Sequence, residues 1–163
     1  MKPNAKIRIN YCFIILALGF ILSPQTSFSQ LKSYSFEEID HLQKIEKKPI
    51  VIFLHTNWCK YCGLMRNTTL KNKPVVELLN KNYYFVDFDA EDKRVISFHN
   101  NTFTYKPTGN NTGIHQLATV LGTVNGSISY PVLCILNSDY EIIFQHNQYL
   151  SPKDMLHILE RLK

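Results

Sequence analysis

The pattern of apolar and polar positions in the first half of the chain predicts a strand, a helix and a second strand in succession. Residues 50–55 predict a strand, and all but the last, His55, are apolar without alternation, as in a central strand that is covered on both faces. Residues 59–70 predict a helix, and residues 83–89 predict a second strand. A crossover of this length between two strands indicates a right-handed parallel βαβ unit. Ahead of this unit, residues 36–47 predict a helix that begins behind a capping-box pattern at Ser35.

The middle of the chain predicts smaller elements. Residues 95–98 and 102–105 alternate around an Asn-rich turn, which favours a β-hairpin. Residues 107–113 are polar and rich in turn formers, so we expect a loop there. Apolar residues between 114 and 121 then mark a short helix that ends at Gly122.

The last third predicts a hairpin of strands and a terminal helix. Residues 130–136 form an apolar run that opens with Tyr130-Pro131, and residues 140–144 are expected to return antiparallel to it. The terminal helix begins with Ser151 as its cap and Pro152 in its first turn.

The first 29 residues have the layout of a cleavable secretory signal. Lys2, Lys6 and Arg8 form a positive head, the apolar stretch 11–22 follows, and small residues precede Gln30. The apolar stretch is shorter than the ~20 residues that span a bilayer, which argues against a membrane anchor. We therefore expect a signal peptide over 1–29, a single domain over 30–163, and export to the periplasm.

Charge gives no reason to expect a nucleic-acid partner. The formal net charge of the 163-residue chain is +5, but three positive charges and no acidic residue lie in residues 1–29, so residues 30–163 carry +2. No basic cluster is interleaved with aromatic residues, which is the usual footprint of a nucleic-acid surface.

Two cysteines carry the chemistry that the sequence predicts. Cys59 and Cys62 form a Cys-x-x-Cys at the junction between the strand 50–55 and the helix after it. Unpaired N–H groups and the helix dipole at such a junction favour a thiolate, and the second sulfur lies one turn further in. Residues 30–163 contain three cysteines. In an exported protein an odd number of cysteines with one close pair indicates a redox-active pair rather than a structural framework. Cys134, the third, reads as a small buried hydrophobe.

Trp58-Cys59-Lys60-Tyr61-Cys62 after a buried strand, and Tyr130-Pro131 opening a later strand before a hairpin and terminal helix, resemble the thioredoxin superfamily. The resemblance covers about residues 36–163 and is nearest to exported bacterial thioredoxin-like proteins. It implies a thioredoxin-like α/β fold with a central mixed sheet flanked by helices. It also implies that Pro131 is cis and lies against the cysteine pair.

The sequence departs from the family pattern in two ways. Many thioredoxins carry a buried acid six residues before the first cysteine, where this chain has Phe53. Cys62 must therefore lose its proton in another way. The stretch between Asp89 and Pro131 is also longer than in a minimal thioredoxin, and we expect an inserted hairpin and helix there that shape partner recognition.

The resemblance implies a mechanism and a set of site residues. Cys59 is expected to attack a substrate disulfide as a thiolate, and Cys62 to resolve the mixed disulfide. Residues expected to contact the substrate flank this pair: Trp58, Lys60, Tyr61, Tyr130 and Pro131. No cofactor or metal is expected. His55 is read as a structural histidine, with thiolate stabilisation or proton transfer as the alternative.

Three functions remain open at this point. The leading one is a periplasmic thiol–disulfide oxidoreductase that acts on protein substrates, as a reductase rather than an oxidase, with a membrane-embedded electron donor. The second is a copper or zinc carrier that uses the thiolates, with His55 nearby. The third is a non-catalytic thioredoxin-like module that recognises partners through residues 95–121.

Overall fold

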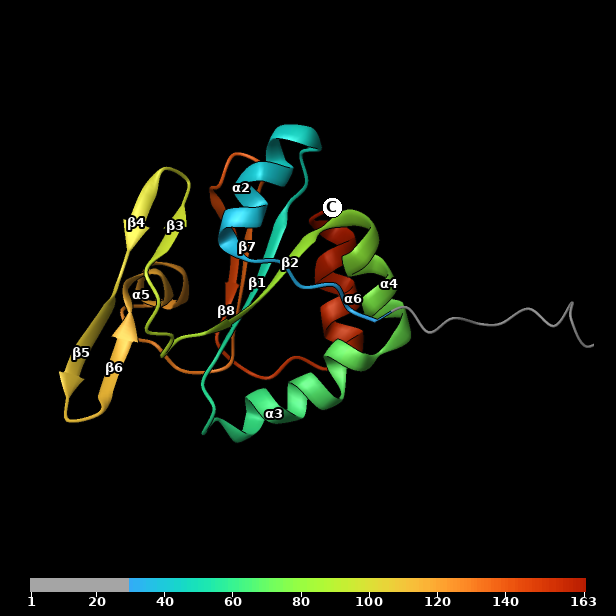
Figure 1. Ribbon diagram of the computed structural model, residues 1–163. Helices are drawn as coiled ribbons and strands as arrows, with labels where there is room; N and C mark the ends of the chain where they lie inside the picture. Colours follow the sequence, from blue (N-terminus) through green and yellow to red (C-terminus); the bar gives the residue numbers. More distant parts are fainter. Residues whose placement is uncertain (1–29) are drawn as a thin grey trace, which may run out of the picture.

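A four-stranded mixed sheet forms the centre of the computed structural model, which describes residues 30–163 (Figure 1). The strand order is β2-β1-β7-β8. β1 pairs parallel with β2 and antiparallel with β7, and β7 pairs antiparallel with β8. The predicted βαβ unit and the C-terminal hairpin are thereby confirmed, while the predicted signal segment lies outside the described residues. The strands are β1 (Ile50–His55), β2 (Tyr84–Asp89), β7 (Val132–Leu136) and β8 (Ile142–His146).

Helices cover both faces of the sheet and divide the core into two clusters. On one face, Ile50, Ile52 and Leu54 of β1 pack in a cluster with residues of α2 and α5. On the other face, Val51 and Phe53 pack with residues of α3, α4 and α6. All six residues of β1 are buried, as the unbroken apolar run predicts. The helices are α2 (Phe36–Ile45), α3 (Lys60–Asn67), α4 (Lys73–Asn82), α5 (Gln116–Gly122) and α6 (Pro152–Arg161).

The helix expected over 59–70 ends earlier than the sequence indicates. α3 stops at Asn67, and a short 3₁₀ turn, η1 (Thr69–Lys71), carries the chain to α4. The side chain of Thr68 donates a hydrogen bond to the carbonyl of Leu64, and the Thr69 hydroxyl donates to the carbonyl of Leu150. These side-chain bonds compete with a regular helix and turn the chain at this point.

Two small hairpins fill the stretch between β2 and β7. The first, β3 (Ile96–Phe98) with β4 (Asn101–Phe103), confirms the predicted hairpin. The second, β5 (Tyr105–Gly109) with β6 (Thr112–His115), shows that the loop predicted over 107–113 is wrong. Figure 1 shows both hairpins beside α5, away from α4 and α6.

Gly113 belongs to a strand of the second hairpin because of a close contact across the pair. A Cβ atom at this position would lie within van der Waals overlap of the Tyr105 hydroxyl and of the carbonyl oxygen of Lys106 across the pair. The glycine therefore permits close approach of two strands, and does not mark a turn. The turn itself contains Asn111, whose φ of 58° is in the left-handed region.

The residues just before α2 cover the outer edge of the sheet. Ser33 forms a parallel bridge with Phe85 of β2, and the amide of Tyr34 donates to the Phe85 carbonyl at 2.9 Å. The amide of Asp87 in turn donates to the Ser33 hydroxyl. This short pairing satisfies polar groups that an edge strand would otherwise expose. Within residues 30–163, no helix is long and apolar enough to cross a bilayer.

Candidate active site

Cys59 and Cys62 are joined by a disulfide at the N-terminus of α3. The Sγ–Sγ distance is 2.11 Å and the Cα atoms are 5.2 Å apart. Cys59 is the N-cap residue, and its sulfur accepts a hydrogen bond from the amide of Cys62 at 3.1 Å. The amide of Gly63 donates to the Cys59 carbonyl. The first sulfur thus lies where unpaired helix N–H groups favour negative charge.

The two sulfurs differ in exposure. Cys59 is half-buried, whereas Cys62 is 2% exposed and belongs to the core cluster beneath α3. A bulky disulfide substrate can therefore reach Cys59 but not Cys62. This asymmetry fits an attacking Cys59 and a resolving Cys62.

Trp58 is exposed beside the disulfide, and a ring contact and a hydrogen bond hold its side chain in place. Its side chain is 68% exposed, and its ring packs edge-on against the ring of Tyr130, with centroids 6.2 Å apart. Its indole N–H donates to Glu91 Oε1 at 3.1 Å. Glu91 follows β2, so this bond ties the active-site loop to the next strand end. The sequence reading did not identify Glu91, because nothing local marks it as a partner of Trp58.

Tyr130 packs in the same core cluster as Cys59, and Tyr130 and Pro131 line one groove with Tyr61 of α3. The Tyr130-Pro131 peptide bond is cis. Tyr130 packs against both core clusters, and burial, with the charges of Glu91 and Asp89, raises its pKa to about 12. The phenol therefore stays neutral and can donate a hydrogen bond at physiological pH.

A groove of about 380 Å³ is lined by three of the predicted substrate residues, Tyr61, Tyr130 and Pro131. Tyr61 belongs to α3, whereas Tyr130 and Pro131 come directly before β7. Residues 147–149 also line the groove, which sequence reasoning missed because they follow β8, far from the cysteines in the chain. Lys60 is exposed in the first turn of α3, and its side chain makes no hydrogen bond or ion pair with any residue of the described range 30–163.

Cys134 is separate from this site. It lies in the middle of β7, fully buried, in the core cluster on the face of the sheet that carries α2 and α5. Burial raises its thiol pKa to about 12. The expectation of a small buried hydrophobe is consistent with this position. Among residues 30–163, no group of three or more His, Cys, Asp or Glu side chains is arranged to hold a metal ion.

A charged cluster that sequence reasoning missed lies further along α3. His55 ends β1 and is 4% exposed; its Nε2 lies 3.0 Å from Asp87 Oδ1 and 2.5 Å from Arg66 Nη2. Arg66 also donates to Asp87 Oδ1 at 2.6 Å. Burial alone would raise the pKa of Asp87, but the hydrogen bonds from His55 and Arg66 outweigh it and hold that pKa below its ordinary value.

The three residues come together because of strand and helix periodicity. Asp87 is two residues beyond Phe85 on β2, and His55 is two residues beyond Phe53 on β1, so both point to the face that carries α3. Arg66 is four residues after Cys62 on α3, which places it on the same side of that helix. Only the spacing from Cys62 to Arg66 could have been noticed in the sequence.

A comparison with protein-family models identifies the family of the chain. The family model of the thioredoxin-like domain matches residues 36–163. The chain belongs to the thioredoxin-like family. Together with the Cys59–Cys62 disulfide, this membership makes it a thioredoxin-like thiol–disulfide oxidoreductase. No curated protein sequence matches the chain.

Solved structures confirm the thioredoxin-like fold at low sequence identity. A structure described as DsbH oxidoreductase shares 14% identity, with a TM-score of 0.59 over 86% of this chain and 89% of its own. A thioredoxin from Thermus thermophilus shares 16% identity, with a TM-score of 0.58 over 82% and 87%. The reduced DsbD C-terminal domain from Neisseria meningitidis shares 15% identity, with a TM-score of 0.52 over 78% and 92%.

Proposed function

We propose that this thioredoxin-like protein is exported and reduces disulfides in protein substrates. The observation that carries the proposal is the half-buried Cys59 at the N-cap of α3, beside the groove of Tyr61, Tyr130 and Pro131. An extended substrate segment would lie in this groove, with its disulfide sulfur next to Cys59. Trp58 and Lys60 would contact the substrate at the exposed rim.

The reaction starts from the reduced cysteine pair. The Cys59 thiolate attacks one sulfur of the substrate disulfide, a Cys59–substrate bond forms, and the other substrate sulfur leaves as a thiolate. Cys62 then attacks Cys59, forming the Cys59–Cys62 disulfide and releasing the second substrate thiol. Two electrons pass to the substrate in each turnover. A dithiol donor, which we place in a membrane protein, restores the reduced pair by the reverse exchange.

Trapping tests the exchange chemistry. Cys62→Ser should accumulate mixed disulfides with substrate proteins, because the resolving sulfur is gone, whereas Cys59→Ser should form none. Cys134→Ala is the matched control, since its sulfur lies on the far face of the sheet, and it should reduce insulin like the unaltered protein. Absence of mixed disulfides in Cys62→Ser would refute the proposal. Stoichiometric copper or zinc on a protein without insulin reductase activity would support the carrier alternative instead.

The equilibrium with glutathione tests the direction. A potential near −270 mV would agree with a reductant, and one near −120 mV would make the protein an oxidant. Export is supported by the positive head, apolar stretch and small residues of positions 1–29. Mass spectrometry of the protein from the periplasm should find a mature N-terminus at Gln30; an intact N-terminus there would contradict cleavage.

A further inference from the structure

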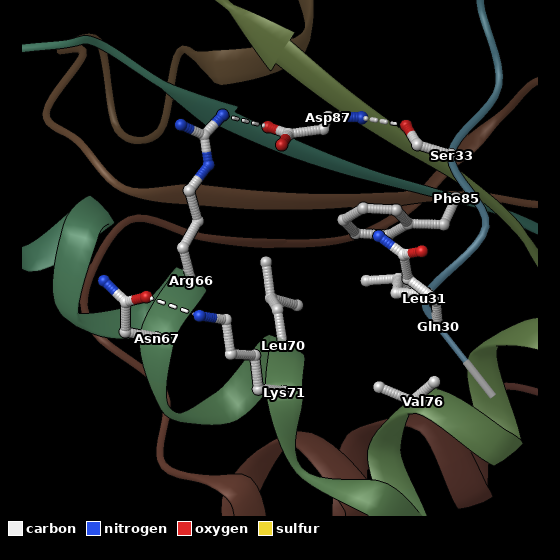
Figure 2. Close-up of a pocket in the computed structure, with 10 residues that line it drawn as sticks. All are labelled: Gln30, Leu31, Ser33, Arg66, Asn67, Leu70, Lys71, Val76, Phe85 and Asp87. Carbon is white, nitrogen blue, oxygen red and sulfur yellow. Dashed lines mark hydrogen bonds and ion pairs between the residues drawn. The ribbon is translucent and has the colours of Figure 1, made fainter. Parts of the chain in front are cut away.

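A cavity of about 570 Å³ lies beside the C-terminal end of α3 and shares no lining residue with the substrate groove. Pockets that bind small molecules commonly measure about 300–1,000 Å³, so this cavity has the size of a ligand site. Figure 2 shows Arg66, Asn67 and Lys71 on one side of it and Leu31 and Phe85 on the other. The disulfide exchange proposed above uses none of these residues.

Hydrogen bonds hold the wall of the cavity that faces α3. This wall is the lead-in segment, residues 30–33, which runs past the end of β2 (Figure 2). The side chain of Asn80 on α4 accepts a hydrogen bond from the amide of Lys32 and donates one to the carbonyl of Gln30, each at 2.9 Å. Ser33 is bridged to β2. The cavity is therefore bounded by segments that are bonded to the rest of the fold.

The floor of the cavity is apolar. It is made by Leu70 of η1, Val76 of α4 and Phe85 of β2, and Leu31 of the lead-in segment adds an apolar side chain to the wall. None of these side chains has a hydrogen-bond donor or acceptor. A polar group of a ligand placed against them would lose its bonds to water without a replacement, which is unfavourable. The part of a ligand that lies on this floor is therefore apolar.

The polar groups that line the cavity bond largely to one another. Arg66 donates to Asp87 Oδ1 at 2.6 Å, and the Asp87 amide donates to the Ser33 hydroxyl at 3.2 Å. The Lys71 ammonium donates to Asn67 Oδ1 at 2.9 Å. These groups leave few acceptors for the several N–H groups of a peptide backbone. A ligand with one polar end suits this lining better than a peptide does.

The charge of the lining selects the polar end of the ligand. Two cationic side chains, Arg66 and Lys71, and one carboxylate, Asp87, line the cavity. Arg66 is paired with Asp87, whereas the exposed Lys71 ammonium makes no ion pair with any residue of the described range 30–163. The uncompensated charge is thus a single ammonium, which complements a monoanion. A dianion such as a phosphate monoester would bring a second negative charge close to the Asp87 carboxylate.

We propose that this cavity binds a medium-chain fatty acid, with its carboxylate on the Lys71 ammonium and its alkyl chain over Leu70, Val76 and Phe85. The carboxylate accepts a hydrogen bond from Lys71 Nζ, and the chain brings no polar group to the apolar floor. This binding function goes beyond the proposed disulfide exchange and does not depend on it, because no cysteine lines the cavity. The same helix, α3, carries Cys59 at its N-cap and contributes Arg66 and Asn67 to the cavity.

Titration with decanoate and with decanol separates the two ends of the ligand. Calorimetry on protein expressed from the full chain should show saturable binding of decanoate at one site per protein. Decanol has the same chain without the charge and should bind about tenfold more weakly, as for loss of one hydrogen bond between charged groups. Amide chemical shifts in NMR spectra should change at residues 30–33, 66–76 and 85–87. Absence of saturable decanoate binding, or shifts confined to other residues, would overturn the proposal.

Variants test the assigned contacts. Lys71→Gln should weaken decanoate binding about tenfold, to the level of decanol, and leave decanol binding unchanged. Lys153→Gln, an exposed lysine on α6, is the matched control and should bind both ligands like the unaltered protein. Leu31→Ala should weaken both ligands alike, since it removes apolar contact only. Equal decanoate affinity in Lys71→Gln and Lys153→Gln overturns the proposal. Tighter binding of a short peptide that ends in a leucine carboxylate also overturns it, because the cavity would then be a site for a protein C-terminus.

Discussion

The indole N–H of Trp58 donates a hydrogen bond to Glu91, so the exposed ring next to the disulfide is anchored to the chain beyond β2. The ring also packs against Tyr130, one residue before the cis proline. The Trp58 side chain is 68% exposed, but these two contacts hold it in one position. It therefore offers a partner an apolar surface that is already ordered before binding.

Trp58→Ala should weaken exchange with proteins more than with small disulfides. Loss of one aromatic contact of about 1 kcal/mol lowers kcat/KM for insulin about fivefold. The rate with a small disulfide, which does not reach the ring, should change less than about twofold. Steady-state reduction assays with both substrates make the comparison. Val120→Ala, an exposed apolar residue on α5, is the control, and an equal loss for both substrates would contradict a contact role for Trp58.

Alkylation should distinguish the thiols of the reduced protein. Cys59 lies at the helix N-terminus, where thiolates are favoured. Iodoacetamide at pH 7 should therefore modify Cys59 before the other thiols of the protein, and faster than it modifies free cysteine. Cys134 should remain unmodified until denaturant is added, because it is buried and its pKa is raised to about 12. Peptide mass spectrometry after timed quenching reads both rates. Native labelling of Cys134 at the rate of Cys59 would contradict the placement of these sulfurs.

Cys134 should also make folding stability sensitive to alkaline pH. Burial raises its pKa from 9.0 to about 12, so the unfolded chain loses this proton first. Its contribution is complete below about pH 9 and is lost as pH rises toward 12. In Cys134→Ala, the fall in unfolding free energy between pH 8 and 10.5 should be smaller by about 1–2 kcal/mol. Urea titrations at each pH measure the unfolding free energy of both proteins. Tyr83, whose pKa is also about 12, contributes equally to both and cancels in the comparison.

Asp87 should contribute stability at neutral pH that disappears in acid. Its folded pKa lies below the ordinary value of 3.8, so its contribution is present above that value and is lost as pH falls through the lower folded pKa. Asp87→Asn should cost about 2 kcal/mol at pH 7, as expected for hydrogen bonds to a charged group. The difference from the unaltered protein should shrink below about pH 4.

Asp139→Asn is the matched control for that change. Its ion pair with Lys47 is 67% exposed on both sides, and such pairs contribute less than about 1 kcal/mol. Urea unfolding of both variants from pH 3 to 7 makes the comparison. If Asp139→Asn and Asp87→Asn cost the same at pH 7, the cluster beneath α3 has no special role in stability.

Much of the fold could be predicted because its signals are local. Three kinds of signal each indicate their element within a few residues: the unbroken apolar run 50–54, the caps at Ser35 and Ser151, and Pro131 at the opening of a strand. The second hairpin could not be predicted. Pro107 and Gly113 are turn formers in most contexts, and only the partner strand shows that Gly113 is needed for close approach to Tyr105.

The candidate site also contains residues that local sequence signals reveal and residues that they do not. Cys59 and Cys62 were found from their spacing, and their disulfide and helix position agree with it. The association of His55 with Arg66 and Asp87 could not be found, because the residues are 11 and 32 positions from His55 in the chain and meet only through strand register and helix packing. Phe53 occupies the position of the buried acid of many thioredoxins, so the sequence shows that this carboxylate is absent. The sequence does not show which groups lie near that position in the fold.

The position of Cys134 has a consequence for repeated turnover. Its sulfur and the catalytic pair are on opposite sides of β1 and β7, in clusters that share no strand face. Thiols that meet can shuffle into wrong bridges whenever one of them is a thiolate. Here the sheet separates them, so the pair can be oxidised and reduced many times without Cys134 forming a wrong disulfide with either member.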